Sequence, residues 1–215
     1  MGAKTWMLVA CKGEPHEILI GRPALDRDAS ALVLKDLYPG KNFLALSDGD
    51  LSNTCPGDDE IVIGAFNGLT VVAAAEFCVD YPSQLPSKFI DAFPGQSVFL
   101  HAMHSTVDWF AFAVWKDGKL QRSLSLSPDS GVIEDIGDRL AFEAQYWSGN
   151  HPTIDEDDAD GSDYPFAFHP LELGEATLAA LFGYQLEGVS DRTLIEPEKI
   201  QLLRFKRKKP WWRLI

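Results

Sequence analysis

The sequence predicts a single α+β domain with a largely antiparallel sheet, about three helices and one long irregular acidic loop. Two pairs of apolar segments are each joined by a two-residue turn, Asn67-Gly68 and Asp117-Gly118. Such turns are typical of β-hairpins because these residues accept positive φ values. Three other segments space their apolar residues as helices do. Hydrophobic residues make up 46% of the 215 residues, which is enough for a sizeable core.

The expected strands are short apolar or alternating segments bounded by Gly, Pro, Asn or Asp. They cover residues 5–10, 42–47, 60–66, 69–75, 97–103, 107–116, 119–126 and 199–205. From Trp109 to Trp115 every residue is apolar, so we expect this strand to lie inside the sheet with both faces buried.

Three helices are expected, over residues 26–38, 86–93 and 173–186. The first carries acidic residues in its first turn, where they complement the helix dipole. Its residues Leu32, Leu34 and Leu37 are expected near one buried face.

Regular patterning stops between residues 127 and 163, where Gly, Pro, Asn and acidic residues accumulate. Within this stretch Glu156, Asp158 and Asp160 match the first ligands of a calcium-binding loop. The position at which a bidentate Glu would close such a site is Ala167. A solvated acidic loop is therefore the leading interpretation, and a weak divalent-metal site is the alternative.

A second candidate metal site consists of His101, His104 and Asp108. On a strand, residues three apart point to opposite faces, so the two histidines should not share one ion unless the chain bends after them. Packed or hydrogen-bonded histidines are the leading interpretation, and the sequence indicates neither a metal nor a cofactor.

Polar and aromatic residues that could form a catalytic pocket lie late in the sequence: Glu143, Tyr146, His151 and His169. No serine or cysteine nucleophile stands in a recognisable turn beside them. The leading interpretation is that these residues hold a long loop against the core. A pocket that encloses several of them with perturbed pKa values would favour an enzyme instead.

Charge is distributed unevenly along the chain. The formal net charge is −13, yet the last twelve residues hold six basic residues and no acidic one, which leaves −19 for residues 1–203. We expect a domain over residues 1–205 followed by a basic, tryptophan-rich tail over residues 206–215. The candidate binding residues of this tail are Lys206, Arg207, Lys208, Lys209, Trp211, Trp212 and Arg213.

Three partners suit such a tail. It can dock on the acidic body of its own chain, on a second subunit or on an acidic protein, because exposed apolar clusters are usually covered. It can rest on an anionic membrane surface, with the tryptophans at headgroup level. Nucleic acid is the least favoured partner, because no folded basic surface accompanies the tail.

Three cysteines, Cys11, Cys55 and Cys78, show no metal-ligand spacing, which is typical of reduced thiols in a cytoplasm. We expect Cys11 and Cys78 in the core and Cys55 in a loop. Neither a secretory signal nor an 18-residue apolar stretch is expected to direct the chain to a membrane.

Four segments of the chain carry a resemblance to known proteins: Met1-Gly-Ala-Lys-Thr5, Phe168-His-Pro-Leu-Glu-Leu-Gly-Glu-Ala176, Ala180-Leu-Phe-Gly183 and Leu202-Leu-x-Phe205. They resemble a family of uncharacterised actinobacterial proteins, classed as a domain of unknown function. The resemblance extends to about Phe205 and implies a bacterial cytoplasmic protein. It implies no reaction, ligand or catalytic residue.

The leading functional hypothesis is a non-enzymatic cytoplasmic binding or accessory protein. One alternative is a small hydrolase-like enzyme with a pocket around the four residues from Glu143 to His169. The other is a peripheral membrane protein that attaches through its tail.

Overall fold

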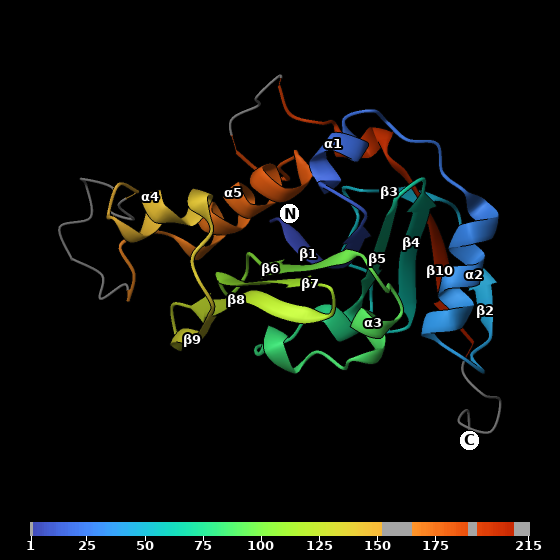
Figure 1. The fold of residues 1–215 in the computed structure, drawn as a ribbon, viewed down its shortest axis with the longest axis horizontal. Coiled ribbons are helices and arrows are strands. Elements are labelled where there is room, and N and C mark those ends of the chain that lie inside the picture. Colours follow the sequence, from blue (N-terminus) through green and yellow to red (C-terminus); the bar gives the residue numbers. More distant parts are fainter. Residues whose placement is uncertain (1, 152–164, 189–192, 209–215) are drawn as a thin grey trace.

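The computed structural model contains one antiparallel sheet with helices on both of its faces (Figure 1). It describes residues 2–151, 165–188 and 193–208. Within these residues the sheet has ten strands: nine follow the order β2-β10-β4-β5-β1-β6-β7-β8-β9, and β3 pairs with β10 beside this path. The predicted class, a single α+β domain with a largely antiparallel sheet, is confirmed.

The strands are β1 Lys4–Cys11, β2 Phe43–Ala45, β3 Gly49–Asp50, β4 Glu60–Phe66, β5 Leu69–Ala74, β6 Ser97–His104, β7 Trp109–Lys116, β8 Lys119–Ser127, β9 Gly131–Ile136 and β10 Gln201–Arg207. The α-helices are α1 Pro15–Leu19, α2 Arg27–Leu37, α3 Lys88–Asp91, α4 Ala144–Trp147 and α5 Pro170–Phe182. Short 3-10 helices are η1 Ala75–Phe77, η2 Pro82–Gln84, η3 Ala141–Glu143 and η4 Pro197–Lys199.

Both predicted hairpins are confirmed. β4 and β5 meet at Asn67-Gly68, and β7 and β8 meet at Asp117-Gly118. The φ angles of Asp117 and Gly118 are +49° and +73°, the left-handed conformation that such a turn requires. β7 is also buried along both faces, from Trp109 to Trp115, as its unbroken apolar sequence predicts.

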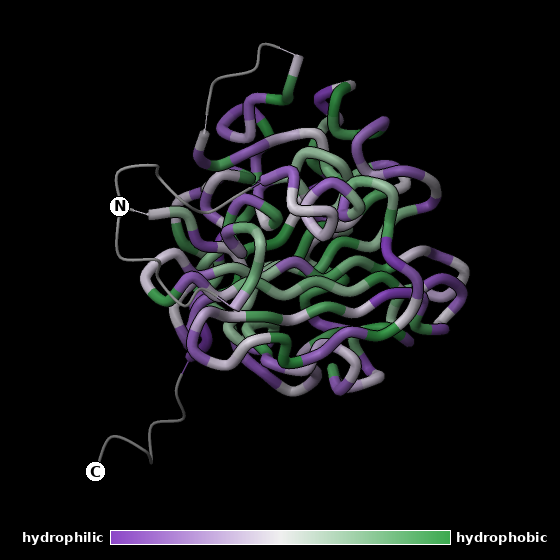
Figure 2. Tube along the Cα trace, turned by 90° about the vertical axis from the view of Figure 1, so that its left-hand side faces the viewer, coloured by the Kyte–Doolittle hydropathy of each residue, from purple (hydrophilic) through white to green (hydrophobic). Residues whose placement is uncertain are grey.

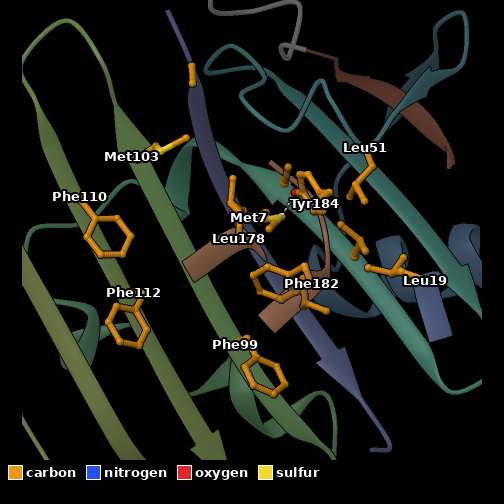
Figure 3. Packing of buried hydrophobic residues seen from close by; sticks show 14 of the residues in the cluster. Met7, Leu19, Leu51, Phe99, Met103, Phe110, Phe112, Leu178, Phe182 and Tyr184 are labelled. Carbon is orange, nitrogen blue, oxygen red and sulfur yellow. Dashed lines mark hydrogen bonds between the residues drawn. The ribbon is translucent and has the colours of Figure 1, made fainter. Parts of the chain in front are cut away.

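Two hydrophobic cores lie on opposite faces of the sheet. One core packs α5 and α1 against the sheet and includes Met7, Phe182 and Tyr184, which meet in Figure 3. The other core packs α2 and α3 against the opposite face and includes Leu34 and Phe89. In the hydropathy view the strands are mainly green and the outer loops largely purple (Figure 2). Burial of two apolar faces therefore stabilises the sheet from both sides.

Helix α2 begins where the sequence indicates, because the Asp26 carboxylate accepts a hydrogen bond from the Ala29 N–H at 2.9 Å. Leu34 and Leu37 are buried, but Leu32 is 60% exposed, so its predicted place on the buried face is wrong. Leu32 lies two residues before Leu34, and this separation corresponds to a rotation of about 200° around the helix axis. The side chain of Leu32 therefore points toward solvent.

Helix α5 is shifted toward the N-terminus relative to the prediction. It begins after His169, whose ring nitrogen accepts the Leu171 N–H, and Pro170 occupies its first turn. It ends at Gly183, whose φ of +79° provides a left-handed cap. The capping chemistry at both ends, rather than the apolar stripe alone, sets its length.

Among its described residues, the predicted irregular stretch 127–163 contains a strand and two short helices that the sequence does not reveal. β9 joins the edge of the sheet beside β8, and η3 and α4 follow it. β9 contains the acidic pair Glu134-Asp135, which obscures its strand pattern. In the structure, side chains of β8 and η2 donate hydrogen bonds to these two carboxylates. Tertiary contacts therefore determine that this segment forms a strand.

Candidate functional site

A cleft of about 640 Å³ opens beside the first turns of α5. It is bounded by the end of α4, the start of β1 and the segment after Tyr184. Its lining residues are Ala3, Tyr146, His151, His169, Leu171, Glu172, Glu175, Gln185, Glu187 and Gly188. Tyr146, His151 and His169, three of the four residues proposed from the sequence, therefore lie around one cavity.

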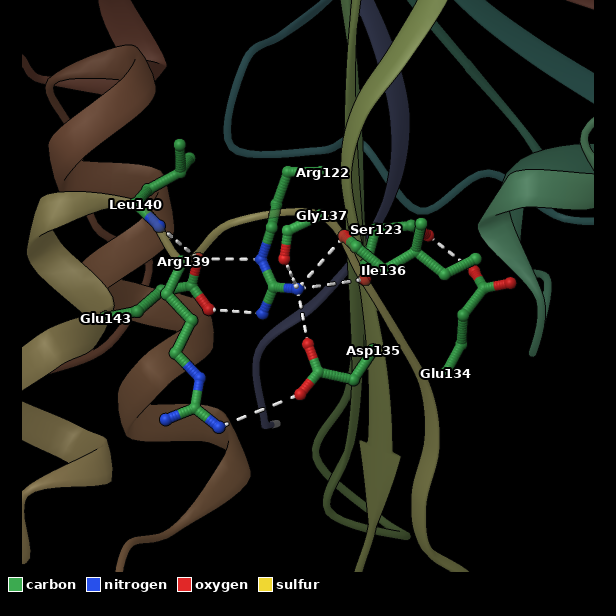
Figure 4. A network of polar contacts seen from close by, with 9 residues as sticks. All are labelled: Arg122, Ser123, Glu134, Asp135, Ile136, Gly137, Arg139, Leu140 and Glu143. Carbon is green, nitrogen blue, oxygen red and sulfur yellow. Dashed lines mark hydrogen bonds and ion pairs between the residues drawn. The ribbon is translucent and has the colours of Figure 1, made fainter.

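Glu143, the fourth candidate residue, does not line this cleft. Its carboxylate accepts hydrogen bonds from Arg122 Nε at 2.9 Å and Nη2 at 2.6 Å, and both side chains are fully buried. Figure 4 shows the Glu143 side chain directed at the guanidinium group, which also pairs with Asp135. Glu143 therefore anchors the segment after β9 to β8 and does not face a ligand.

Three carboxylates, from Glu172, Glu175 and Glu187, give the cleft its charge. No lysine or arginine stands among the described residues that line it. A partly desolvated cavity whose lining carries this excess of negative charge attracts cations and repels anions. The sequence does not single out these glutamates, although Glu175 interrupts the apolar stripe of α5, four residues after Leu171 and three before Leu178. A carboxylate at such a position is the signal that could have found the site.

Glu175 is the most perturbed carboxyl group of the cleft. It is 9% exposed, and burial raises its pKa to about 7. Its oxygens accept the backbone N–H groups of Leu186 at 2.8 Å and Glu187 at 3.1 Å, which oppose this rise because they favour the charged form. The negative charge of Glu187 adds to the rise. Glu175 thus links α5 to the opposite wall of the cleft and changes charge near neutral pH.

The titration of Glu175 predicts a loss of stability on the alkaline side. The folded protein holds this proton more strongly than the unfolded chain, so its contribution is fully present below pH 4.5 and disappears as the pH rises through about 7. We expect the free energy of unfolding to fall less steeply with rising pH in Glu175→Gln than in the wild type. Urea unfolding of both proteins across the pH range measures this. Parallel pH profiles would contradict the assignment.

His169 is oriented by contacts at both ring nitrogens. Nδ1 accepts the Leu171 N–H at 3.2 Å, and Nε2 lies 3.6 Å from the Asp108 carboxylate. Because Nδ1 is an acceptor, the proton of the neutral ring lies on Nε2 and points toward Asp108. His169 would have to give up a contact before acting as a base.

An aromatic wall completes the cleft. The rings of Tyr146 and His151 stack with centroids 4.2 Å apart, and Tyr146 also packs edge-on against Phe168. Burial raises the pKa of Tyr146, with a smaller contribution from the charge of Glu172. Its hydroxyl therefore stays protonated near neutral pH, as a hydrogen-bonding group.

The sequence matches a family of unknown function (DUF6928) over residues 5–205. The chain belongs to this family. The predicted resemblance to a domain of unknown function is thereby confirmed, and the family description states no activity. No curated protein and no solved structure matches the chain.

In this member of the family, the candidate metal site at His101, His104 and Asp108 is not assembled. His101 and His104 lie three positions apart on β6; His101 is fully buried, whereas His104 is partly exposed. His101 Nδ1 lies 2.6 Å from the Thr5 hydroxyl and Nε2 lies 3.0 Å from the Gly174 carbonyl oxygen. Asp108 faces His169 instead. No cluster of metal-binding side chains occurs within the described part of the chain, and Glu156, Asp158 and Asp160 lie outside it.

Buried His101 predicts destabilisation by acid. Burial lowers its pKa to about 4, although the Gly174 carbonyl opposes this. Its contribution is fully present above pH 6.5 and is lost as the pH falls toward 4. We expect the difference in unfolding free energy between wild type and His101→Gln to shrink over this interval, as measured by urea unfolding. A difference that does not depend on pH would argue against a neutral buried imidazole.

The first basic residues of the predicted tail are part of the sheet. Lys206 and Arg207 end β10, where Lys206 lies 3.6 Å from Asp59 and Arg207 pairs with Glu76. The Arg207 guanidinium also lies over the Tyr38 ring, 4.8 Å from its centroid. The Lys208 N–H bonds to the Asn42 carbonyl at 2.9 Å, and its side chain is exposed. Lys209, Trp211, Trp212 and Arg213 lie outside the described residues.

The three cysteines are free thiols. Cys11 is buried as predicted, but Cys78 is exposed, so its expected place in the core is wrong. Cys78 follows η1, where the chain turns out of the sheet after the buried Phe77. Partial burial raises the pKa of Cys55, so its thiol is not activated as a nucleophile.

Within residues 2–151, 165–188 and 193–208, every helix is too short or too polar to cross a membrane.

Proposed function

We propose that this chain is a non-enzymatic binding protein whose cleft takes a small cationic ligand. The observation that carries the proposal is the lining of the cleft: three glutamates, an aromatic wall and no basic side chain among its described residues. Ammonium groups form charge-assisted hydrogen bonds with carboxylates. They also interact with aromatic side chains, and His151 and Tyr146 form the aromatic wall of this cleft.

The chemistry of the lining supports binding over catalysis. No serine, threonine, cysteine or lysine side chain stands among the described lining residues. His169 engages both ring nitrogens, and Glu175 engages both carboxylate oxygens. A catalytic group would need to be freer than these two to move a proton.

One observation favours an enzyme as the second candidate function. The pKa of Glu175, about 7, suits a group that donates or accepts a proton near neutral pH. In that case a hydrolytic reaction would use Glu175 as the general acid or base, with Tyr146 and His151 holding the substrate. Turnover of a substrate that disappears in Glu175→Gln would favour this alternative.

The proposal includes a bacterial cytoplasmic setting. The resemblance to actinobacterial proteins supports it, and so do the three free thiols, because disulfides are rare in a reducing compartment.

Calorimetric titration with matched four-carbon compounds tests the binding proposal. The protein is titrated with 1,4-diaminobutane, 1,4-butanediol and butanedioate, which share a chain length and differ in charge. We expect only the diamine to bind, and to bind more tightly at pH 8 than at pH 6 because Glu175 is then ionised. Equal binding of the diol, or preferential binding of the diacid, would contradict the proposal.

Matched variants locate the binding site. Glu172→Gln and Glu187→Gln should each weaken diamine binding by about 10- to 100-fold, since a charge-assisted hydrogen bond contributes about 1.5–3 kcal/mol. Asp36→Asn is the control, because this exposed carboxylate lies on α2, on the opposite face of the sheet. Equal losses in the control would show that net charge, rather than the cleft, governs binding.

A further inference from the structure

We infer that the cleft receives the basic C-terminal segment, residues 208–215, of a second copy of this chain. This inference rests on the proposed cation-binding function and names its partner. A basic peptide carries the ammonium and guanidinium groups that the cleft selects, and it supplies aromatic side chains as well.

The cleft has a neighbouring cavity, and the two together form the proposed docking groove. A second cavity of about 310 Å³ shares the lining residues Ala3, Gln185 and Glu187 with it. This second cavity continues past Leu186 to Pro197. Two neighbouring cavities suit an extended peptide better than a compact molecule.

The charges of groove and segment are opposite. The lining of the two cavities includes the four glutamates Glu172, Glu175, Glu187 and Glu198, and its single described basic residue is Lys4. Residues 208–215 contain Lys208, Lys209 and Arg213 and no acidic residue. Steering by such opposite charges would speed association at low salt and weaken it at high salt.

Apolar groups match as well. The segment carries Trp211 and Trp212 after Pro210, a residue that favours an extended backbone before it. The groove offers the side chain of Leu171 and the aromatic wall that His151 forms with Tyr146. Tryptophan at the centre of an interface commonly dominates binding energy, with charged pairs around it.

The remaining basic residues of the chain's end are already paired. Lys206 and Arg207 contact Asp59 and Glu76 of their own chain. Lys206 and Arg207 are therefore engaged within their own chain, and the proposed docking segment begins at Lys208.

The geometry of β10 favours a second copy over the chain's own groove. Pro197 and Glu198, just before β10, line the groove, and the seven residues from Gln201 to Arg207 then carry the chain roughly 20 Å away from it. Residues 209–215 can span at most about 25 Å. To reach the groove of their own chain, they would have to use most of that length to run back along β10. Helices α4 and α5, which contribute residues to the lining of the cleft, lie to the left of β10 in Figure 1.

Complementation between two full-length variants tests the inference. One variant, Glu172→Gln/Glu187→Gln, has a weakened groove, and the other, Trp211→Ala/Trp212→Ala, has a weakened segment. Analytical ultracentrifugation measures self-association of each protein, and of their mixture, at low and high salt. We expect the wild type to self-associate with a salt-sensitive constant that each variant weakens at least tenfold. The mixture should recover association, because it still pairs one intact groove with one intact segment.

The outcomes separate this inference from the proposed function. A wild type that stays monomeric at every concentration, or a mixture that associates no better than its components, overturns segment docking. Diamine binding by the Trp211→Ala/Trp212→Ala protein, measured in parallel, would leave the cation-binding cleft intact in that event. Sedimentation with vesicles of anionic phospholipid adds a third reading: recruitment of a monomeric wild type, but not of this variant, would assign the segment to a membrane surface instead.

Discussion

Replacement of Glu143 by alanine is expected to lower the free energy of unfolding by about 3–5 kcal/mol, because it leaves the buried Arg122 guanidinium without its main partner. Both side chains are fully buried, and two hydrogen bonds join them. Glu143 also accepts the Leu140 N–H at 2.7 Å, which holds the start of η3. Urea unfolding of the wild type and Glu143→Ala measures the loss.

Two comparisons identify the cause of that loss. Glu196→Ala removes one partner of the exposed Arg22–Glu196 pair and should leave stability nearly unchanged, because solvent screens that pair. The double variant Arg122→Met/Glu143→Leu removes both charges and should recover much of the stability, because no unpaired buried charge remains. If the double variant is as unstable as Glu143→Ala, altered packing rather than the unpaired charge would account for the loss of stability.

Replacement of Gly137 by alanine is expected to cost about 3 kcal/mol, from left-handed backbone strain together with overpacking. Gly137 has a φ of +81°, and an added Cβ would collide with the backbone carbonyl oxygen of Gln121. A backbone group cannot turn aside as a side chain can. The collision would also disturb Arg122, whose Nη1 lies 3.4 Å from the Gly137 carbonyl oxygen.

Gly118→Ala is the matched control for this substitution. Gly118 has a similar φ of +73°, but no atom lies within 4 Å of its added Cβ. It should therefore show the conformational cost alone, about 1 kcal/mol. Thermal and urea unfolding compare the two variants. Equal losses would mean that strand β8 yields at Gln121, and would contradict a rigid contact there.

The hairpins were predictable because their information is local. The turns at Asn67-Gly68 and Asp117-Gly118 fix the register of strands whose apolar residues are adjacent in sequence. β9 was not predictable in this way, because its acid Glu134 is satisfied by Ser123 of β8 and by Ser83 of η2, which lie far from it in sequence. Its neighbour Asp135 depends likewise on Arg122.

The candidate site was predictable only in part. Aromatic and histidine residues around the irregular stretch indicated Tyr146, His151 and His169, which do meet around one cleft. The acids that give this cleft its charge come from α5 and from the segment after it. Glu172 and Glu187 resemble ordinary solvent-facing positions, and only Glu175 stands out, because it interrupts the apolar stripe of α5. Glu143 has the same chemistry as Glu175, and only the position of Arg122 in the fold determines that it is a structural residue.

The central claim is that the carboxylates of this cleft hold a cationic ligand, and backbone amide NMR tests it most directly. The N–H groups of Leu186 and Glu187 donate to Glu175, so their amide shifts report on that carboxylate. Addition of 1,4-diaminobutane should move the signals of these two residues and of Leu171, while 1,4-butanediol should leave them in place. Shift changes that are absent at these three residues, or that fall elsewhere on the surface, would contradict the account.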